Sequence, residues 1–273
     1  MGSGAAAFDA AASGYDAHFT HTTLGRWLRE ALRERLDFPP GARVLELGCG
    51  TGEDAVWLAS RGVAVVATDA SEAMLDVARG KAAAAGVEAR VRWARVDLAR
   101  DGLPEGPFDG ACSSFGALNC LEDRRPLAQA MARAVRPGGR VVLSLMGPLC
   151  AWEIAWNLAR LRPGVAFRRL RAGAPADVGG GRAVRVWYPS PRRLAAELGA
   201  AGFRLRGLAG LGVFLPPTEL RALVDRRPRL FAWLRDRERR WAACWPWNRW
   251  GDHYVAVFKR AKPTTGAQER EDR

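Results

Sequence analysis

Three glycines at alternate positions, Gly48, Gly50 and Gly52, are the residues best suited to hold a ligand. They follow an apolar run over residues 43–47 and precede a helical pattern over residues 53–61. Glycine lets the backbone approach a bound molecule closely and adopts positive φ at little cost. The helix that follows would point unpaired N–H groups at the same place. The spacing therefore indicates the nucleotide-binding end of an α/β sheet.

Two acidic residues, Asp69 and Asp97, come directly after the next two apolar segments that are typical of strands. An ionised carboxylate has two acceptor oxygens, so Asp69 suits both hydroxyls of a ribose. Asp97 suits the amino group of an adenine, with Leu98 packing on the ring. Either acid alone has an alternative role, because acids at strand ends also form turns and cap helices. Together, beside the glycine turn, they predict a nucleoside site.

The elements that must position these residues alternate regularly along the first half of the chain. Strands are expected at residues 43–47, 64–68, 90–95, 108–113 and 140–145, and helices at 53–61, 71–85 and 122–135. Short apolar strands alternating with helices predict a parallel sheet covered on both faces. Ligands of such sheets bind at the carboxyl ends of the strands, where the glycines and acids lie.

The flanking segments are less regular. Residues 1–14 are small and polar and are expected to be disordered, and a helix is expected at about 22–36. A Gly/Ala/Pro-rich stretch covers residues 172–181. The other elements expected after Met146 are a helix at 148–162, a strand at 183–188, a helix at 190–201, a strand at 203–213, a basic helical segment at 218–243 and a final strand at 253–259. The last two strands predict a β-pair added to the sheet.

Five motifs in this order resemble those of the class I S-adenosylmethionine-dependent methyltransferases. They are residues 44–52, Asp69, and residues 96–98, 108–114 and 136–142. The resemblance implies an α/β, Rossmann-like three-layer sandwich. Its seven-stranded sheet would be mostly parallel, with an antiparallel last strand and a helical or hairpin cap after the fifth strand. The rival family, the dinucleotide dehydrogenases, has a G-x-G-x-x-G fingerprint, whereas the spacing here is G-x-G-x-G.

The resemblance also implies the cofactor, S-adenosylmethionine, and the residues that hold it. Glu46 would orient the amino end of its methionine moiety. Tyr15, shortly before the first helix, resembles the lid of the family. The full set of expected cofactor contacts is Tyr15, Glu46, Gly48, Cys49, Gly50, Gly52, Asp69, Ala70, Met74, Asp97, Leu98 and Ser113.

Methyl transfer is an in-line displacement that needs an aligned acceptor and a dry site. A base helps when the acceptor must lose a proton. Of the three histidines, His18 lies in the N-terminal segment and His253 opens the final strand, so both are candidate bases. The alternative is that His18 is a surface residue and His253 a polar residue at a strand start.

The residues after the fourth strand, Ser114, Phe115 and Asn119, are expected to contact the acceptor. The sequence here lacks the Asn/Asp-Pro-Pro-aromatic signature of the DNA amino-methylating enzymes, which argues against that activity. O-, N-, S- or C-methylation of a small molecule stays open. Trp152, Trp156, Trp187 and Tyr188 are the candidate pocket-lining residues of the cap.

The charge is uneven along the chain. Residues 1–150 carry 17 basic and 18 acidic residues, whereas residues 151–273 carry 25 and 11. Within 221–250, nine arginines alternate with five tryptophans. Three readings stay open: a cap helix with a solvated basic face, a pocket for a flat or greasy acceptor, and a surface for an anionic membrane or RNA.

Together these observations predict a bacterial methyltransferase acting on a small aromatic or lipophilic acceptor, as in natural-product tailoring. An RNA-directed methyltransferase and a non-catalytic cofactor-binding protein are the alternatives. The five cysteines form no Cys-x-x-Cys pair, so no metal is expected and a reducing cytoplasm fits best. No stable partner is implied. The expected parts are lid helices at 1–39, the cofactor-binding core at 40–146, a substrate cap at 147–189, the basic, Trp-rich end of the sheet at 190–260 and a disordered tail at 261–273.

Overall fold

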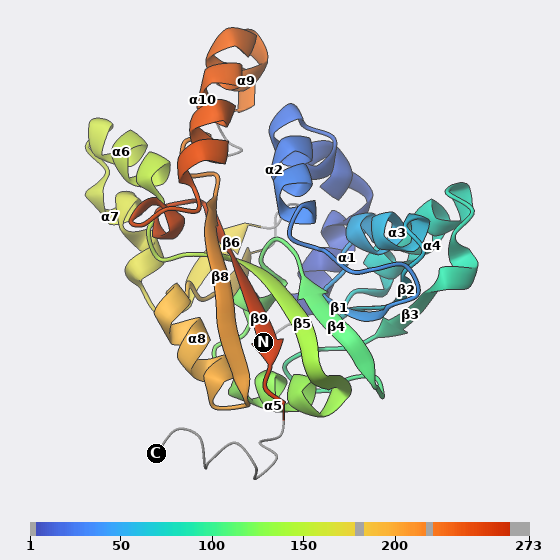
Figure 1. Ribbon diagram of the computed structural model, residues 1–273. Coiled ribbons are helices and arrows are strands. Elements are labelled where there is room, and N and C mark those ends of the chain that lie inside the picture. Colours follow the sequence, from blue (N-terminus) through green and yellow to red (C-terminus); the bar gives the residue numbers. More distant parts are fainter. Residues whose placement is uncertain (1–3, 178–182, 217–220, 263–273) are drawn as a thin grey trace, which may run out of the picture.

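A seven-stranded sheet forms the centre of the molecule in the computed structural model, which describes residues 4–177, 183–216 and 221–262 (Figure 1). Its strand order is β3-β2-β1-β4-β5-β9-β8. The strands are β1 Arg43–Leu47, β2 Ala64–Asp69, β3 Val91–Arg95, β4 Phe108–Ser113, β5 Val135–Met146, β8 Phe203–Leu211 and β9 His253–Arg260. Only β9 runs antiparallel to its neighbours, β5 and β8. The expected mostly parallel sheet with an antiparallel last strand is confirmed.

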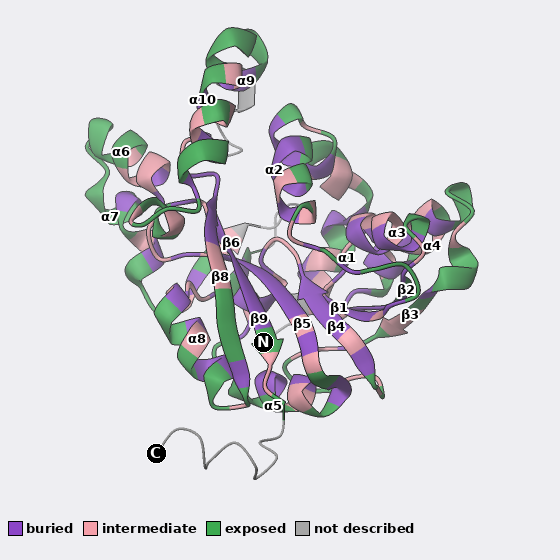
Figure 2. Ribbon diagram, viewed as in Figure 1, coloured by how far each residue is buried: buried purple, intermediate pink, exposed green. Residues whose placement is uncertain are grey.

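Helices cover both faces of the sheet. On one face lie α2 Thr23–Arg33, α3 Glu53–Ser60 and α4 Glu72–Ala84, and on the other lie α5 Arg125–Ala134 and α8 Pro191–Gly199. Neighbouring residues of β1 point to opposite faces: Val44 joins the first core cluster and Leu45 the second. The central strands are therefore buried on both sides (Figure 2), as continuous apolar strands require.

Residues 4–15 form a helix, α1 Gly4–Tyr15, so the expected disorder was wrong for residues 4–14, whereas residues 1–3 lie outside the described residues. Ala7, Ala11 and Ala12 are buried. Their small side chains let α1 lie close to α4, and the Asp9 carboxylate accepts a 2.6 Å hydrogen bond from the Ser71 hydroxyl. Sequence composition missed this helix because small residues can pack tightly without any long apolar side chain.

The part after β5 is an insertion of short elements beside the sheet. They are α6 Ala151–Ala159, α7 Pro163–Ala166 and a two-stranded antiparallel sheet of β6 Ala174–Asp177 and β7 Ala183–Val186. The strand β6 was not expected, because its segment is rich in glycine, alanine and proline.

The expected basic helical segment at 218–243 contains two helices, α9 Arg221–Arg226 and α10 Pro228–Trp241, while its residues 218–220 lie outside the described residues. Both project from the end of the sheet at the top of Figure 1. Within the described ranges, none of the helices has both the length and the hydropathy to cross a membrane. Residues 263–273 of the expected tail lie outside the described residues.

Candidate functional site

The glycine turn joins β1 to α3 in a left-handed backbone. The φ angles of Gly48, Gly50 and Gly52 are 68°, 53° and 76°, a region that favours glycine. A Cβ on Gly48 would collide with Ala117, and one on Gly52 would collide with Ala78. By contrast, no atom lies within 4 Å of a Cβ built on Gly50. Gly48 and Gly52 therefore allow Ala117 and Ala78 to pack directly against the turn. Gly50 instead borders open space in which a ligand can lie.

Glu46 occupies the carboxyl end of β1 with its side chain only 1% exposed. Its Oε2 has no hydrogen-bond partner among the described residues. Burial raises the pKa of Glu46 well above its ordinary value, the charge of Asp54 raises it further, and Arg29 opposes both. A buried acceptor without a partner is costly. The cationic amino group of S-adenosylmethionine fits this position, because it would supply the missing donor and charge.

Asp69 is held in place by the turn that it faces. Its Oδ2 accepts from Gly50 N at 2.8 Å and its Oδ1 accepts from Ser71 N at 3.0 Å. Burial raises the pKa of Asp69, and these N–H groups partly offset that effect. Each carboxylate oxygen keeps a second lone pair. The fixed carboxylate can therefore accept hydrogen bonds from the two ribose hydroxyls of the cofactor.

Asp97 forms a turn at the end of β3. Its Oδ1 accepts from Ala99 N at 3.0 Å, and its own N–H donates to Asp101 Oδ2 at 2.8 Å. The turn-forming role considered for this acid is thus present. Its adenine contact stays a prediction, as do those of Leu98, Ala70 and Met74; Leu98 is partly buried, and Met74 is buried beneath α1.

The N-terminal segment is fastened over the glycine turn. The Thr51 hydroxyl donates to Asp16 Oδ1 at 2.7 Å, and Lys81 Nζ lies 2.6 Å from Asp16 Oδ2 and 2.7 Å from Glu53 Oε1. We call Asp16, Thr51, Lys81 and Glu53 the latch. Burial acts to raise the pKa of Asp16, but the hydrogen bonds from Lys81 and Thr51 bring it below its ordinary value. The latch therefore has its full strength at neutral pH.

Tyr15 immediately precedes the latch and lies among the charged groups of the site. Burial raises the pKa of its hydroxyl; the charge of Arg29 lowers it, and that of Asp69 raises it. The Tyr15 ring packs in the cluster of Ala11, Ala12 and Met74, and Tyr15 and Met74 share an expected cofactor contact. That contact itself stays a prediction.

A buried ion pair supports the site from the α2 side. Arg29 Nη1 lies 2.5 Å from Asp54 Oδ2, and Arg33 Nε lies 2.9 Å from Asp54 Oδ1. Burial acts to raise the pKa of Asp54, but the two guanidinium groups bring it below its ordinary value. Sequence reasoning did not single out these residues, because arginines on a helix are usually solvated.

The end of β4 carries a strained residue, Phe115, with φ at 51°. A bulky residue in this left-handed region is strained, and such strain gathers at functional sites. Its ring centroid lies 5.0 Å from that of Phe19 and 5.5 Å from that of His253. Phe115 thus connects the N-terminal lid with the final strand. The nearby Ser113 hydroxyl donates to Leu47 O at 2.7 Å, and the buried Ser114 hydroxyl has no hydrogen-bond partner among the described residues.

The Asn119 side chain binds the backbone at both ends of the cap insertion, and its expected acceptor contact stays a prediction. The side chain is fully buried. Its Nδ2 donates to Met146 O at 3.0 Å and to Trp187 O at 2.6 Å, and its Oδ1 accepts from Met146 N at 3.0 Å. Both amide donors are therefore used by the backbone. Asn119 fastens the two ends of the cap insertion together.

His253 lies in a charged cluster at the start of β9. Its Nδ1 is 3.1 Å from Asp252 Oδ2, and Arg169 Nη2 is 2.5 Å from Asp252 Oδ1. Arg169 Nε lies 2.7 Å from Glu153 Oε2. Burial acts to raise the pKa of Asp252, but His253 and Arg169 hold it far below its ordinary value. Of the two candidate bases, His253 is buried beside a carboxylate, although the geometry gives its Nδ1 no hydrogen bond within the described residues, whereas His18 is exposed and its Nδ1 contacts Gly14 O at 2.8 Å.

The four expected pocket-lining residues of the cap have different surroundings. The Tyr188 ring lies 5.3 Å from the Arg169 guanidinium, beside the His253 cluster. Trp187 and Trp152 are partly buried. Trp156 is exposed and stacked at 3.9 Å by the Arg160 guanidinium, so it suits a surface better than a pocket.

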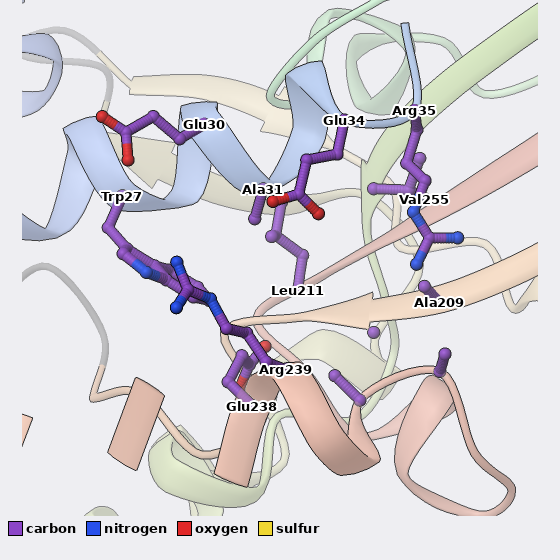
Figure 3. A pocket seen from close by; sticks show the side chains of 13 residues that line it. Trp27, Glu30, Ala31, Glu34, Arg35, Ala209, Leu211, Glu238, Arg239 and Val255 are labelled. Carbon is purple, nitrogen blue, oxygen red and sulfur yellow. The ribbon is translucent and has the colours of Figure 1, made fainter. Parts of the chain in front are cut away.

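A cavity of about 330 Å³ opens between α2, α10 and the strands β8 and β9 (Figure 3). Trp27, Glu30 and Glu34 line it from α2, and Glu238 and Arg239 line it from α10. None of its lining residues belongs to the glycine turn or to the His253 cluster. Sequence reasoning did not predict it, since it forms only where the two helices meet over the sheet.

Comparisons with known proteins agree with this geometry. Residues 44–139 match the family model described as "Methyltransferase domain". A demethylmenaquinone methyltransferase of Mycolicibacterium gilvum (strain PYR-GCK) is 34% identical over 221 residues, covering 76% of this chain and 90% of that protein. The CcbJ methyltransferase structure from Streptomyces caelestis has a TM-score of 0.62 at 21% identity, covering 94% of this chain and 98% of that one. The structure of phosphoethanolamine N-methyltransferase 2 from Haemonchus contortus, in complex with S-adenosyl-L-methionine, has a TM-score of 0.62 at 17% identity. The match covers 93% of this chain and 57% of that one.

Proposed function

Since this chain belongs to the class I S-adenosylmethionine-dependent methyltransferases, we propose that it methylates a small lipophilic aromatic acceptor of the quinone type. The observation that carries the acceptor class is the extent of the similarity. The match to the demethylmenaquinone methyltransferase spans 221 residues, far more than the matched methyltransferase domain at 44–139. It therefore includes segments outside the cofactor core, where acceptors of an α/β fold are selected.

The residues of the glycine turn fit the cofactor. S-adenosylmethionine, when bound, supplies the methyl group from a sulfonium centre. In our proposal, Glu46 binds its amino group, Asp69 binds its ribose hydroxyls, and the backbone around Gly50 lies against its methionine moiety. The latch closes the N-terminal segment over this site and excludes water from it, which strengthens the electrostatic contacts inside.

His253 acts as the base in this proposal. An acceptor that takes a methyl group at an O–H or C–H position must lose the proton of that bond. Nδ1 of His253 faces Asp252, so Nε2 is the atom that takes the proton. Asp252 stabilises the imidazolium that forms, and Arg169 keeps the Asp252 carboxylate in place.

Phe115 and Tyr188 form the apolar and aromatic surroundings of the reacting atoms. Phe115 packs against the His253 ring, and Tyr188 lies beside Arg169 on the cap side. An aromatic acceptor can stack between such rings, because offset and edge-on ring pairs are favourable. This arrangement supports a flat acceptor over a small aliphatic amine.

Transfer of a labelled methyl group tests the proposal. The protein is incubated with methyl-labelled S-adenosylmethionine and, separately, reduced demethylmenaquinone, a water-soluble phenol, an aliphatic amine and RNA. We expect label in the organic extract of the quinol reaction and much less of it with the phenol or the amine. Label in the amine or RNA alone would contradict the proposed acceptor class, while leaving the methyltransferase assignment intact.

A further inference from the structure

Large apolar side chains are exposed mainly at one end of the molecule. Of the thirteen large hydrophobic residues exposed in the described part of the chain, twelve lie within residues 151–171 and 224–250. Leu161 is 90% exposed and Trp245 is 76% exposed. We call these two segments the Trp/Arg surface. Scattered apolar residues on a surface are normal, but a concentration of this kind marks an interaction site.

The two segments of the Trp/Arg surface adjoin each other. Ala151 N, at the start of α6, donates to Trp250 O at 3.0 Å. Gly210 N donates to Ala242 O at 2.7 Å, which holds the end of α10 against β8. α6, α7 and α10 project toward the same end of the sheet (Figure 1), and their outward sides are exposed (Figure 2). They therefore form one surface rather than two isolated patches.

The Trp/Arg surface is strongly positive. Its two segments carry thirteen arginines and four acidic residues. Two of those acids face inward: Glu153 pairs with Arg169, and Glu238 accepts hydrogen bonds from the backbone of Gly212, Val213 and Phe214. A second copy of the chain would present the same positive charge, so self-association is disfavoured. An anionic partner is favoured.

Arginines already cover several of the tryptophan rings. Guanidinium groups lie 3.9 Å from the ring centroid of Trp156 (Arg160), 4.5 Å from that of Trp233 (Arg237) and 5.4 Å from that of Trp241 (Arg240). Single-stranded nucleic acid binds by stacking its bases on free aromatic faces. Here one face of each of these three rings is occupied by an arginine of the chain itself, which makes them less suited to base stacking.

We propose that the Trp/Arg surface binds the face of an anionic phospholipid bilayer. Tryptophan prefers the depth of the lipid headgroups, and arginine pairs with lipid phosphates there. Basic helices with exposed aromatic and aliphatic residues lie on a bilayer without crossing it. Trp250 is two residues from Asp252, so the bound membrane adjoins the His253 cluster. This role is separate from the choice of acceptor.

Vesicle binding by the full chain tests the proposal. Flotation is measured with vesicles of phosphatidylcholine alone and of phosphatidylcholine mixed with phosphatidylglycerol, neither of which contains an acceptor. We expect binding to the anionic vesicles only, with a steep loss at high salt. Brominated phosphatidylcholine in the anionic vesicles should quench the tryptophan fluorescence, because Trp233 and Trp245 enter the headgroup region.

Matched variants locate the binding. Arg237→Gln/Arg240→Gln should weaken vesicle binding by roughly tenfold or more, given the contribution of each basic residue near a membrane. Arg204→Gln/Arg206→Gln removes the same charge from the exposed part of β8 and should change binding little. Circular dichroism and cofactor affinity, unchanged in both variants, would show that each is folded.

Three outcomes would overturn the proposal. They are equal flotation with neutral and anionic vesicles, equal weakening by the two double variants, and absence of vesicle binding. In the last case, retention on RNA would point to a nucleic-acid partner, and a concentration-dependent dimer in solution would point to a second copy of the chain.

Discussion

Oδ2 of Asp252 lies 3.1 Å from Nδ1 of His253, the next residue along the chain. This proximity places a carboxylate beside the ring that the proposed mechanism uses as a base. We therefore expect His253→Gln to lower kcat by about 10²–10⁴-fold, the usual contribution of a general base, with a small change in KM. His18→Gln serves as the control, because His18 is exposed and contacts Gly14 O. An equal loss in both variants, or none in the first, would remove His253 from the mechanism.

Asp252→Asn separates positioning from catalysis. The Arg169 guanidinium is among the groups that hold the pKa of Asp252 low, so the stabilising effect of Asp252 is present above its unfolded pKa and is lost as pH falls through the lower, folded pKa. Breaking this pair should destabilise the protein by roughly 3 kcal/mol at neutral pH in urea unfolding. The variant should lose less stability than the wild type on acidification. Its kcat should fall while KM changes little; a change in KM alone would contradict the positioning role.

Glu46→Gln should improve stability and impair cofactor binding. The pKa of Glu46 is raised well above the ordinary glutamate value, so the folded protein holds this proton more tightly than the unfolded chain does. The stability of the free protein therefore falls as pH rises from about that value toward the folded pKa. Glutamine does not ionise, so the variant does not lose stability in this pH range. It should melt at a higher temperature than the wild type at neutral pH.

Calorimetry of the same Glu46→Gln variant should show affinity for S-adenosylmethionine reduced by roughly 10–100-fold, because a hydrogen bond to a charged group is lost. Glu88→Gln, an exposed acid beyond α4, should change neither property. A variant that binds the cofactor normally would show that Glu46 does not hold its amino group.

Asp16→Ala opens the latch. It removes the partner of both the Thr51 hydroxyl and the Lys81 ammonium group. We expect the cofactor to dissociate about tenfold faster in stopped-flow measurements, since a partly buried, charge-assisted contact is worth about 1–2 kcal/mol. Glu72→Ala breaks an exposed pair with Arg79 and should leave that rate unchanged. An unchanged rate in Asp16→Ala would mean that the segment does not gate the cofactor.

The first half of the chain, in which strands and helices alternate, could be predicted well from the sequence. The expected strands at 43–47 and 108–113 match β1 and β4 residue for residue. Local pattern suffices there, because a strand buried on both faces must be apolar throughout. The glycine turn could also be predicted from the sequence, since the left-handed backbone at Gly48 and Gly52 favours glycine over other residues.

The surroundings of the site depend on contacts between distant segments, and the sequence did not show them. Arg29 meets Asp54 and Arg169 meets Asp252 only after folding. Arginines of this kind have no local signature that separates them from solvated ones. The same holds at Asn119, whose position after β4 suggested an acceptor contact; only the fold shows that its amide binds the backbone of Met146 and Trp187.

That use of Asn119 has a consequence for how such a protein can be re-engineered. One side chain holds both ends of the insertion after β5 against the body of the fold. We expect the stretch between those ends to accept changes in length and composition provided that Glu153 and Arg169, which hold Asp252, are kept. Transplanting such stretches between relatives, with the asparagine kept, is a route to new acceptors that leaves the cofactor machinery untouched.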